Sequence, residues 1–419
     1  MLSSLGVVSI PPPRWTFPIW YINYMDLKLA CRQLFLQNRQ KKGIYQYTVP
    51  SPTAYPYQWF WDSCFHAIIL NHLSCEDAKK EILSLLSKEF DNGMIPHMIY
   101  WKKSVRTTFP HIKWGKHGTS TLTQPPMIAY AVWEIFQKDN DLNFIKAIYP
   151  DLYHFYKYLL TERDPHENNL IGIMNPDESG EDNSPRFDKL LDLPARHTRG
   201  ENRKRRFKLI EQNIECNFDA PFCMRNFFWV KDVPFNSIMI KNLKLLANLA
   251  QKLGEEEDTA YFAKKADDIT SAMRKLMLED GIFWSTYGED YRKIKVKTWA
   301  IFAPLFAQIV TLDEAKKLVS LHLLNPAEFW TNFPVPSTSL DEPSFDPGGF
   351  WRGPTWIGTN WFVYKGLINY GFLKEAEEIR QASVALLQKS GFREYFNPLT
   401  GEGLGAENFT WGGLVVDMV

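Results

Sequence analysis

The stretch Ser237-Ile-Met-Ile-Lys-Asn-Leu-Lys-Leu-Leu-Ala-Asn-Leu-Ala-Gln-Lys-Leu253, followed by Gly254, decides the fold class. Apolar side chains recur in it at intervals of four and three residues, which is the spacing of one face of an α-helix. Gly254 is a helix-stop signal. The acidic residues 255–258 suit a helix N-terminus and open a second segment with the same rhythm. The two segments predict a pair of consecutive helices.

The same periodicity continues on both sides of this pair, and strand-like alternation is confined to short pieces such as 280–285. Helices arriving in pairs indicate a bundle, a solenoid or a closed ring, but the chain lacks the sequence period of a solenoid. Long aromatic-rich loops between alternate helices favour an all-α toroid of paired helices, with the loops gathered at one mouth. The further helices are expected near 26–41, 63–73, 76–90, 122–138, 143–161, 293–308, 312–322, 355–369 and 373–389.

Composition excludes several classes of protein. The 48 Lys and Arg balance the 48 Asp and Glu, whereas a nucleic-acid binder needs clustered positive charge. No apolar run approaches the roughly 18 residues of a membrane span, and residues 1–10 lack the basic region of a signal peptide. Five cysteines without a C-x-x-C pair predict free thiols in a cytoplasmic protein.

Residues 187–230 interrupt the helical rhythm and form an insertion in what we expect to be a single domain spanning 1–419. The insertion contains a run rich in Arg and Lys at 196–208. One interpretation is a solvated hairpin or lid. The other is that one or two of its cations reach an anionic group of a substrate. Lys102 and Lys103 also favour an anionic ligand.

The loop Tyr55-Pro-Tyr-Gln-Trp-Phe-Trp-Asp-Ser-Cys-Phe-His66 places two Trp and one Asp just before a predicted helix. Indole faces stack on sugar rings, and a carboxylate accepts hydrogen bonds from ring hydroxyls. A helix N-cap is the alternative role for Asp62. This loop favours a sugar-binding site.

The loop 175–186 holds four carboxylates within six residues, in a context of Gly, Pro and Ser. Its spacing does not fit an EF-hand calcium loop. Packed carboxylates raise one another's pKa, which is how a general acid stays protonated near neutral pH. A purely structural turn is the alternative.

Two further loops combine aromatic side chains with charge. In 348–361, Arg352 can bind hydroxyls or hold a carboxylate, while Trp361 fits a helix core better. In 391–411, Glu394 projects from a loop end, and Glu402 and Glu407 compete with it.

Other reaction classes are poorly supported, because the sequence lacks the nucleophile elbow, zinc-protease, phosphate-loop and dinucleotide-binding motifs. His97 is expected to orient a group or contact a sugar, with a core histidine as the alternative. We expect no metal and no cofactor. The remaining candidates are carboxylates, aromatic side chains and an arginine, which are the groups that glycoside hydrolases use for binding and catalysis.

Five ordered motifs resemble the family 63 glycoside hydrolases and, more distantly, trehalases. They span about residues 55–415, and the chain is similar to the compact bacterial mannosylglycerate and glucosylglycerate hydrolases of that family. The motifs are Trp59-Phe-Trp-Asp-Ser-Cys-Phe-His66, Glu178-Ser-Gly-Glu-Asp-Asn-Ser-Pro185, Asp232-Val-Pro-Phe-Asn-Ser237, Gly349-Phe-Trp-Arg-Gly-Pro-Thr-Trp356 and Glu394-Tyr-Phe-Asn-Pro-Leu-Thr-Gly401.

The resemblance implies an (α/α)6 barrel and hydrolysis with inversion, with Asp182 as general acid and Glu394 as general base. It also implies a sugar subsite formed by Trp59, Trp61, Asp62, Gln124, Arg352 and Trp356. We add five neighbours as candidate substrate contacts: His97, Glu178, Gly353, Tyr395 and Trp411.

The expected reaction is release of an α-linked mannose or glucose from a small conjugate, first of all mannosylglycerate or glucosylglycerate, acting as a compatible solute in the cytoplasm. The alternatives are an exo-α-glucosidase of short neutral oligosaccharides and a non-catalytic sugar-binding protein. The expected partner is a small sugar conjugate, with no nucleic acid and no membrane, and the chain is compatible with a homo-oligomer.

Overall fold

The computed structural model describes residues 24–102 and 118–418. The expectations for residues 1–10 and for Lys103 lie outside the described residues. Six inner helices form a closed ring, in which each contacts the next and the last contacts the first. They are α2 (Phe60–Leu73), α4 (Ile128–Asp139), α8 (Val233–Leu253), α10 (Ala303–Ala307), α12 (Ile357–Asn369) and the 3-10 helix η5 (Thr410–Asp417).

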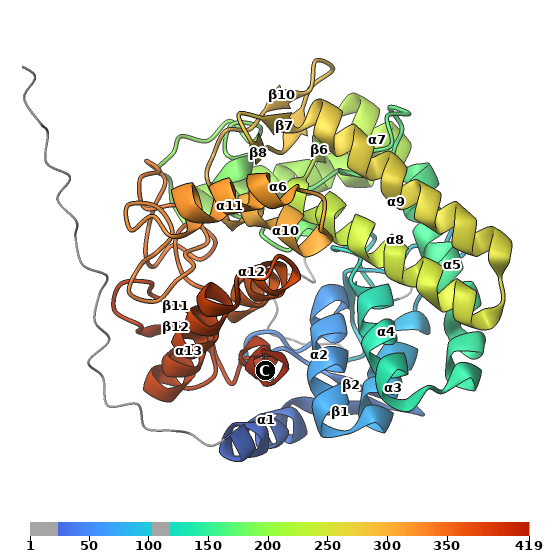
Figure 1. The fold of residues 1–419 in the computed structure, drawn as a ribbon. Helices are drawn as coiled ribbons and strands as arrows, with labels where there is room; N and C mark the ends of the chain where they lie inside the picture. Colours follow the sequence, from blue (N-terminus) through green and yellow to red (C-terminus); the bar gives the residue numbers. More distant parts are fainter. Residues whose placement is uncertain (1–23, 103–117, 419) are drawn as a thin grey trace, which may run out of the picture.

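Figure 1 looks along the axis of this ring and shows a second ring of helices outside it. Four outer helices pack on the inner helix that precedes them in the chain, namely α3 on α2, α5 on α4, α9 on α8 and α13 on α12, while α1 packs on η5. The fold is therefore the predicted (α/α)6 barrel. The outer helices are α1 (Tyr24–Asn38), α3 (Cys75–Leu86), α5 (Leu142–Glu162), α9 (Glu256–Leu276), α11 (Leu312–Leu318) and α13 (Leu373–Ser390).

Local sequence signals explain the predicted α8 and α9 pair. The Asp232 carboxylate caps α8 by accepting a hydrogen bond from the backbone N–H of Phe235 at 3.4 Å. Gly254 ends the helix with φ of 81°, a left-handed conformation that costs glycine little. Acidic residues occupy the first turn of α9, and its apolar stripe, including Phe262 and Ile269, is buried.

Short strands fix the loops between helices. The only described sheet with more than two strands has the order β10-β9-β6-β5, and its pairs are antiparallel. The strands are β1 (Arg39–Lys42), β2 (Tyr45–Thr48), β3 (Gln58–Trp59), β4 (Met98–Ile99), β5 (Gly172–Ile173), β6 (Val230–Lys231), β7 (Leu278–Glu279), β8 (Ile282–Phe283), β9 (Thr286–Tyr287), β10 (Arg292–Lys293), β11 (Arg393–Phe396) and β12 (Gly403–Glu407).

The insertion 187–230 contains two helices, α6 (Arg199–Glu215) and α7 (Ala220–Asn226). A capping box starts α6, because the Thr198 hydroxyl accepts from the backbone N–H of Glu201 while the Glu201 carboxylate accepts from the backbone N–H of Thr198. The basic run is therefore largely the first half of a helix.

The predicted helix at 293–308 is wrong over its first half. Residues 292–293 form strand β10, and helical structure begins only with the 3-10 helix η3 (Trp299–Phe302), which leads into α10. Residues 293–297 alternate lysine with the apolar Ile294 and Val296, which is the two-residue period of an extended chain rather than a helix.

The prediction that all five cysteines are free thiols is also wrong. Cys216 and Cys223 form a disulfide, whereas Cys31, Cys64 and Cys75 are free. The turn between α6 and α7 brings the two Cα atoms to 6.0 Å, within the range that a disulfide bridges. None of the helices in the described parts of the chain is long and apolar enough to cross a membrane.

Candidate active site

Asp182 lies in the loop between α5 and α6 and is bound to the insertion. Its Oδ2 is 2.6 Å from Nη2 of Arg206 on α6. The same guanidinium contacts Oδ1 of Asp177 at 2.5 Å and donates from Nε to the Asn202 side chain at 3.0 Å. The Asp182 side chain keeps 24% of its surface exposed, whereas those of Arg206 and Asp177 are about 10% exposed. Asp182 therefore presents the accessible edge of this cluster.

Glu394 lies on β11, in the loop region before η5, and is almost fully buried. Its Oε1 accepts a hydrogen bond from the Tyr55 hydroxyl at 2.5 Å, and its Oε2 accepts from the backbone N–H of Ala406 at 2.8 Å. Burial raises the pKa of Glu394 to about 7, against the two hydrogen bonds and the positive charge of Arg199, which lower it, while the charge of Asp182 raises it further.

Asp182 and Glu394 belong to one electrostatic cluster. Burial is the main reason that the pKa of Tyr55 is raised, and the charges of both carboxylates add to this shift. Arg199, the first residue of α6, faces the same group, and its guanidinium carbon lies 4.6 Å from the centre of the Phe350 ring. Two arginines of one helix thus face the two predicted catalytic carboxylates.

An aromatic wall connects the start of α2, the loop after α5 that carries Asp182, and η5. Trp61 at the start of α2 packs edge to face on Trp411, with ring centres 5.0 Å apart. Gly180 has φ of 74°, and a Cβ there would lie 2.3 Å from the Trp61 ring, so only glycine lets the Asp182 loop approach this indole. Trp411 donates from Nε1 to Asp62 at 2.7 Å, and burial raises the pKa of Asp62 to about 6.

A second wall precedes α12. The rings of Trp351 and Trp356 stack at 3.8 Å with only 4° between their planes, and Tyr395 lies against Trp356 at 4.9 Å. Both Trp side chains are buried. Because Tyr395 follows Glu394 directly, this stack supports the segment that carries the carboxylate.

Three further candidates lie around the start of α2. Trp59 packs edge to face on the ring of His97 at 5.5 Å. The Ser120 hydroxyl lies 2.6 Å from Nδ1 of His97, whose pKa burial lowers to about 3, so the imidazole is neutral. Gln124 accepts a hydrogen bond from the backbone N–H of Trp61 at 3.3 Å, which positions the first turn of α2.

The Glu178 carboxylate is bound by groups of the protein itself. Its side chain is fully buried, and Arg163 binds both carboxylate oxygens at 2.7 and 2.8 Å. The backbone N–H groups of Thr123 and Met174 donate to the same oxygens. The geometry supports a structural role, in which a buried ion pair holds the loop before α4 and the loop after α5 together.

Arg352 holds a carboxylate, but not that of Asp182 or Glu394. It donates to both oxygens of Asp188 at 2.9 and 2.7 Å and to the carbonyl of Ala195 at 2.6 Å. Gly353 is required for close packing, because a Cβ there would lie 2.3 Å from the carbonyl oxygen of Asp346. Arg352 therefore braces the insertion, and Gly353 allows its own loop to pack closely on Asp346.

Sequence reasoning missed Tyr55, Asp177, Arg199 and Arg206 as individual site residues. Tyr55 stood in a quoted motif and Arg206 in the basic run, but the partner of each is a carboxylate far away in the sequence. One local signal was available, since Thr198 and Glu201 at capping-box spacing predict that α6 starts at Arg199.

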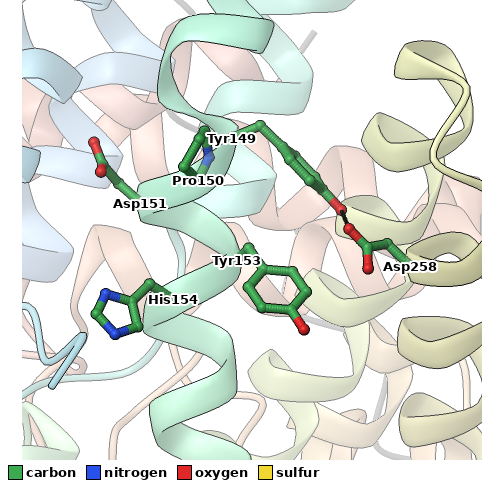
Figure 2. A pocket seen from close by; sticks show the side chains of 6 residues that line it. All are labelled: Tyr149, Pro150, Asp151, Tyr153, His154 and Asp258. Atoms are coloured by element: carbon green, nitrogen blue, oxygen red, sulfur yellow. Dashed lines mark hydrogen bonds between the residues drawn. The ribbon is translucent and has the colours of Figure 1, made fainter.

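Two pockets lie away from this group of side chains. One, of about 460 Å³, lies between the outer helices α5 and α9, where Tyr149 donates to Asp258 at 2.8 Å (Figure 2). The other, of about 590 Å³, lies between α6, α7 and the turn after β9. Neither contains a predicted site residue. Among residues 24–102 and 118–418, no three His, Cys, Asp or Glu side chains are arranged to hold a metal ion.

Comparison with known proteins identifies the family. Residues 55–412 match the model of the mannosylglycerate hydrolase MGH1-like glycoside hydrolase domain. A mannosylglycerate hydrolase of Thermus thermophilus is 34% identical over 89% of this chain and 96% of that protein. A glucosylglycerate hydrolase of Mycolicibacterium hassiacum is 28% identical over 93% of this chain and 97% of that protein.

The solved structures agree as well. The crystal structure of a family 63 mannosylglycerate hydrolase from Thermus thermophilus, in complex with Tris and D-glycerate, superimposes with a TM-score of 0.85. It is 31% identical, and the match covers 94% of this chain and 99% of that one. The chain is therefore an enzyme that belongs to the family 63 glycoside hydrolases, in the group defined by the mannosylglycerate hydrolase MGH1-like domain.

Proposed function

We propose that this enzyme releases α-linked mannose or glucose from a glycerate conjugate, with inversion at the anomeric carbon. The observation that carries the proposal is the cluster of Asp182, Tyr55 and Glu394 beside the Trp61 and Trp411 wall. Two carboxylates beside a stacking surface suit the hydrolysis of a glycosidic bond. The choice of substrate follows the relatives, which are named as hydrolases of mannosylglycerate and glucosylglycerate.

In this proposal the sugar packs on the indole of Trp59, which is partly exposed, whereas Trp61 is buried. Asp182 donates a proton to the glycosidic oxygen, so that glycerate leaves with a neutral hydroxyl group rather than as an alkoxide, and its carboxylate keeps its charge. Glu394 accepts a proton from the water that attacks the anomeric carbon from the opposite face. The hydrogen bonds from Tyr55 and Ala406 fix the Glu394 carboxylate, and its pKa of about 7 suits a base working near neutral pH.

Inversion requires room for a water between the two carboxyl groups, a separation of about 6.5–9.5 Å rather than the roughly 5 Å of retaining enzymes. The barrel and the insertion 187–230 act as one catalytic domain, and the insertion serves as a lid over the aglycone. The proposal also includes a cytoplasmic location and a homo-oligomer.

A substrate panel tests the anionic aglycone. We expect kcat/KM to be at least about tenfold higher for glucosylglycerate and mannosylglycerate than for glucosylglycerol, whose aglycone is neutral and of similar size. Glucosylglycerol lacks the carboxylate and therefore cannot accept a charged hydrogen bond from the enzyme. Maltose serves as the neutral disaccharide. Equal or greater activity on glucosylglycerol or maltose would refute the glycerate assignment and favour an exo-α-glucosidase.

A further inference from the structure

None of the residues that line the pocket between α6, α7 and the turn after β9 serves the proposed hydrolysis. The volume of this pocket, about 590 Å³, is within the range of small-molecule sites. Its walls come from the start of the insertion at 190–192, from α6, from residues 226–229 and from residues 287–288. A ligand bound there would contact both the insertion and the sheet that contains β9.

Aromatic side chains make up much of the apolar wall. Phe227, Phe228 and Trp229 follow one another at the end of the insertion, and Tyr287 lines the pocket from β9. The Phe227 side chain is 39% exposed, although its neighbour Phe228 is buried. Aromatic rings bind flat apolar groups through their faces and edges. The wall therefore suits a ligand with an aromatic body.

The face of α6 that lines the pocket is not the face that binds the catalytic loop. It consists of Arg205, Lys208, Leu209 and Gln212, at the helical spacing of three and four residues. Arg206, which binds Asp182, does not line the pocket. A ligand in the pocket thus meets side chains of α6 that the active site leaves unused.

Positive charge gathers at the pocket. Lys208 is exposed, and neither it nor Lys189 has an ion-pair partner among the residues that the structure describes. The Lys189 Nζ lies 5.7 Å from the centre of the Tyr287 ring. Arg205 is paired with Asp192 at 3.3 Å, but these side chains are 43% and 91% exposed, so the pair is weak. Since Asp192 is the one carboxylate among the lining residues, the pocket attracts an anion.

The Tyr287 hydroxyl is a hydrogen-bond donor that lacks an acceptor. It is buried, and it has no hydrogen-bond partner among residues 24–102 and 118–418. Most buried polar groups of proteins have a partner. Because Tyr287 belongs to the pocket wall, an oxygen atom of a ligand could supply the missing acceptor.

We propose that this pocket is a second ligand site, which binds a small organic anion with an aromatic body. The aromatic body packs on Phe227 and Trp229. Lys189 and Lys208 bind the anionic group, and the Tyr287 hydroxyl donates to an oxygen of the same ligand. A nucleoside monophosphate and an aromatic carboxylate both have this chemistry. The inference goes beyond the proposed function, because it needs neither a sugar nor a catalytic carboxylate.

Titration calorimetry on the full-length enzyme distinguishes the two sources of the anion. We expect adenosine monophosphate or para-hydroxybenzoate to bind at a single site, and the one that binds identifies phosphate or carboxylate as the preferred group. The neutral counterparts, adenosine and para-hydroxybenzamide, should bind about tenfold more weakly, because they lose the charged hydrogen bonds. Equal binding of a neutral counterpart would overturn the proposal, as would no binding of either anion up to about 1 mM.

Variants show whether the anion occupies this pocket. Lys208→Gln should raise Kd about tenfold, and Tyr287→Phe, which removes only the hydroxyl, should raise it about fivefold. Arg203→Gln is the matched control, because Arg203 is exposed on α6 outside the pocket, and it should leave Kd unchanged. An equal loss in Arg203→Gln, or no loss in Lys208→Gln, would overturn the proposal.

One further variant excludes binding in the active site. Asp182→Asn should bind the anion with the Kd of the wild type, whereas a changed Kd would place the anion beside the catalytic loop and contradict the proposal. Thermal unfolding without ligand identifies a variant that misfolds. Lys208 is exposed, so Lys208→Gln keeps the test valid if Tyr287→Phe does not fold.

Discussion

Replacing Asp182 with Asn is expected to lower kcat on glucosylglycerate by about 10³-fold, because the leaving alkoxide then departs without a proton. The change is nearly isosteric, and the side chain is partly exposed at the edge of its cluster rather than buried within it. Substrate binding should survive, so the loss falls on kcat. Steady-state kinetics measure the effect, and ligand binding by calorimetry confirms an intact sugar site.

A substrate that needs no acid identifies the role of Asp182. Fluoride leaves as a stable anion, so Asp182→Asn should hydrolyse α-glucosyl fluoride at a rate close to that of the wild type. Asp192→Asn is the matched control, because this carboxylate follows in the same region and its side chain is 91% exposed. A normal rate of Asp182→Asn on glucosylglycerate would remove Asp182 from the mechanism and make Glu181 the better candidate.

Replacing Glu394 with Gln is expected to abolish hydrolysis of both glucosylglycerate and glucosyl fluoride, with a loss of about 10³-fold or more, because both reactions need an activated water. This shared loss distinguishes a base from an acid. Glu402→Gln and Glu407→Gln are the matched controls, since both residues are exposed near the same two-stranded sheet of β11 and β12. A larger loss in Glu407→Gln than in Glu394→Gln would move the base to Glu407.

The pH profile of the wild type reports the same group. A base works only when deprotonated, so with the pKa of Glu394 raised by burial to about 7, kcat/KM should fall about tenfold per unit below pH 7. Tyr55→Phe removes a hydrogen bond that favours the charged carboxylate, so the acidic limb of that variant should move to higher pH. An acidic limb near pH 4 that Tyr55→Phe leaves in place would contradict this assignment.

The sequence predicted helices with clear periodicity and failed where helices are short. α8 and α9 are long, amphipathic and marked by Asp232, Gly254 and an acidic first turn. The inner helix η5 spans only Thr410–Asp417 and starts Thr-Trp-Gly-Gly, which has low helix propensity, so its place in the ring depends on tertiary contacts with α2 and α12. The ring closes through an element that local rules do not predict.

The candidate site, like the helices, could be predicted from the sequence only in part. Carboxylates and aromatic side chains in motif loops were recognisable, and the structure brings Asp182, Glu394, Trp61 and Trp411 into one region. The partners of Glu178 and Arg352 were not, because Arg163 and Asp188 form ion pairs that only the folded loops create. Charged side chains in a motif can therefore hold loops in place as readily as they bind a sugar, and only their partners tell the two apart.

The configuration of the sugar at the moment of release tests the central claim most directly. Proton NMR can follow the anomeric signals of glucose while the wild-type enzyme hydrolyses α-glucosylglycerate, before mutarotation mixes them. Attack by a water held by Glu394, on the face opposite Asp182, predicts β-glucose as the first product. Initial release of α-glucose would show retention and contradict the assignment of Asp182 and Glu394 as an inverting acid and base.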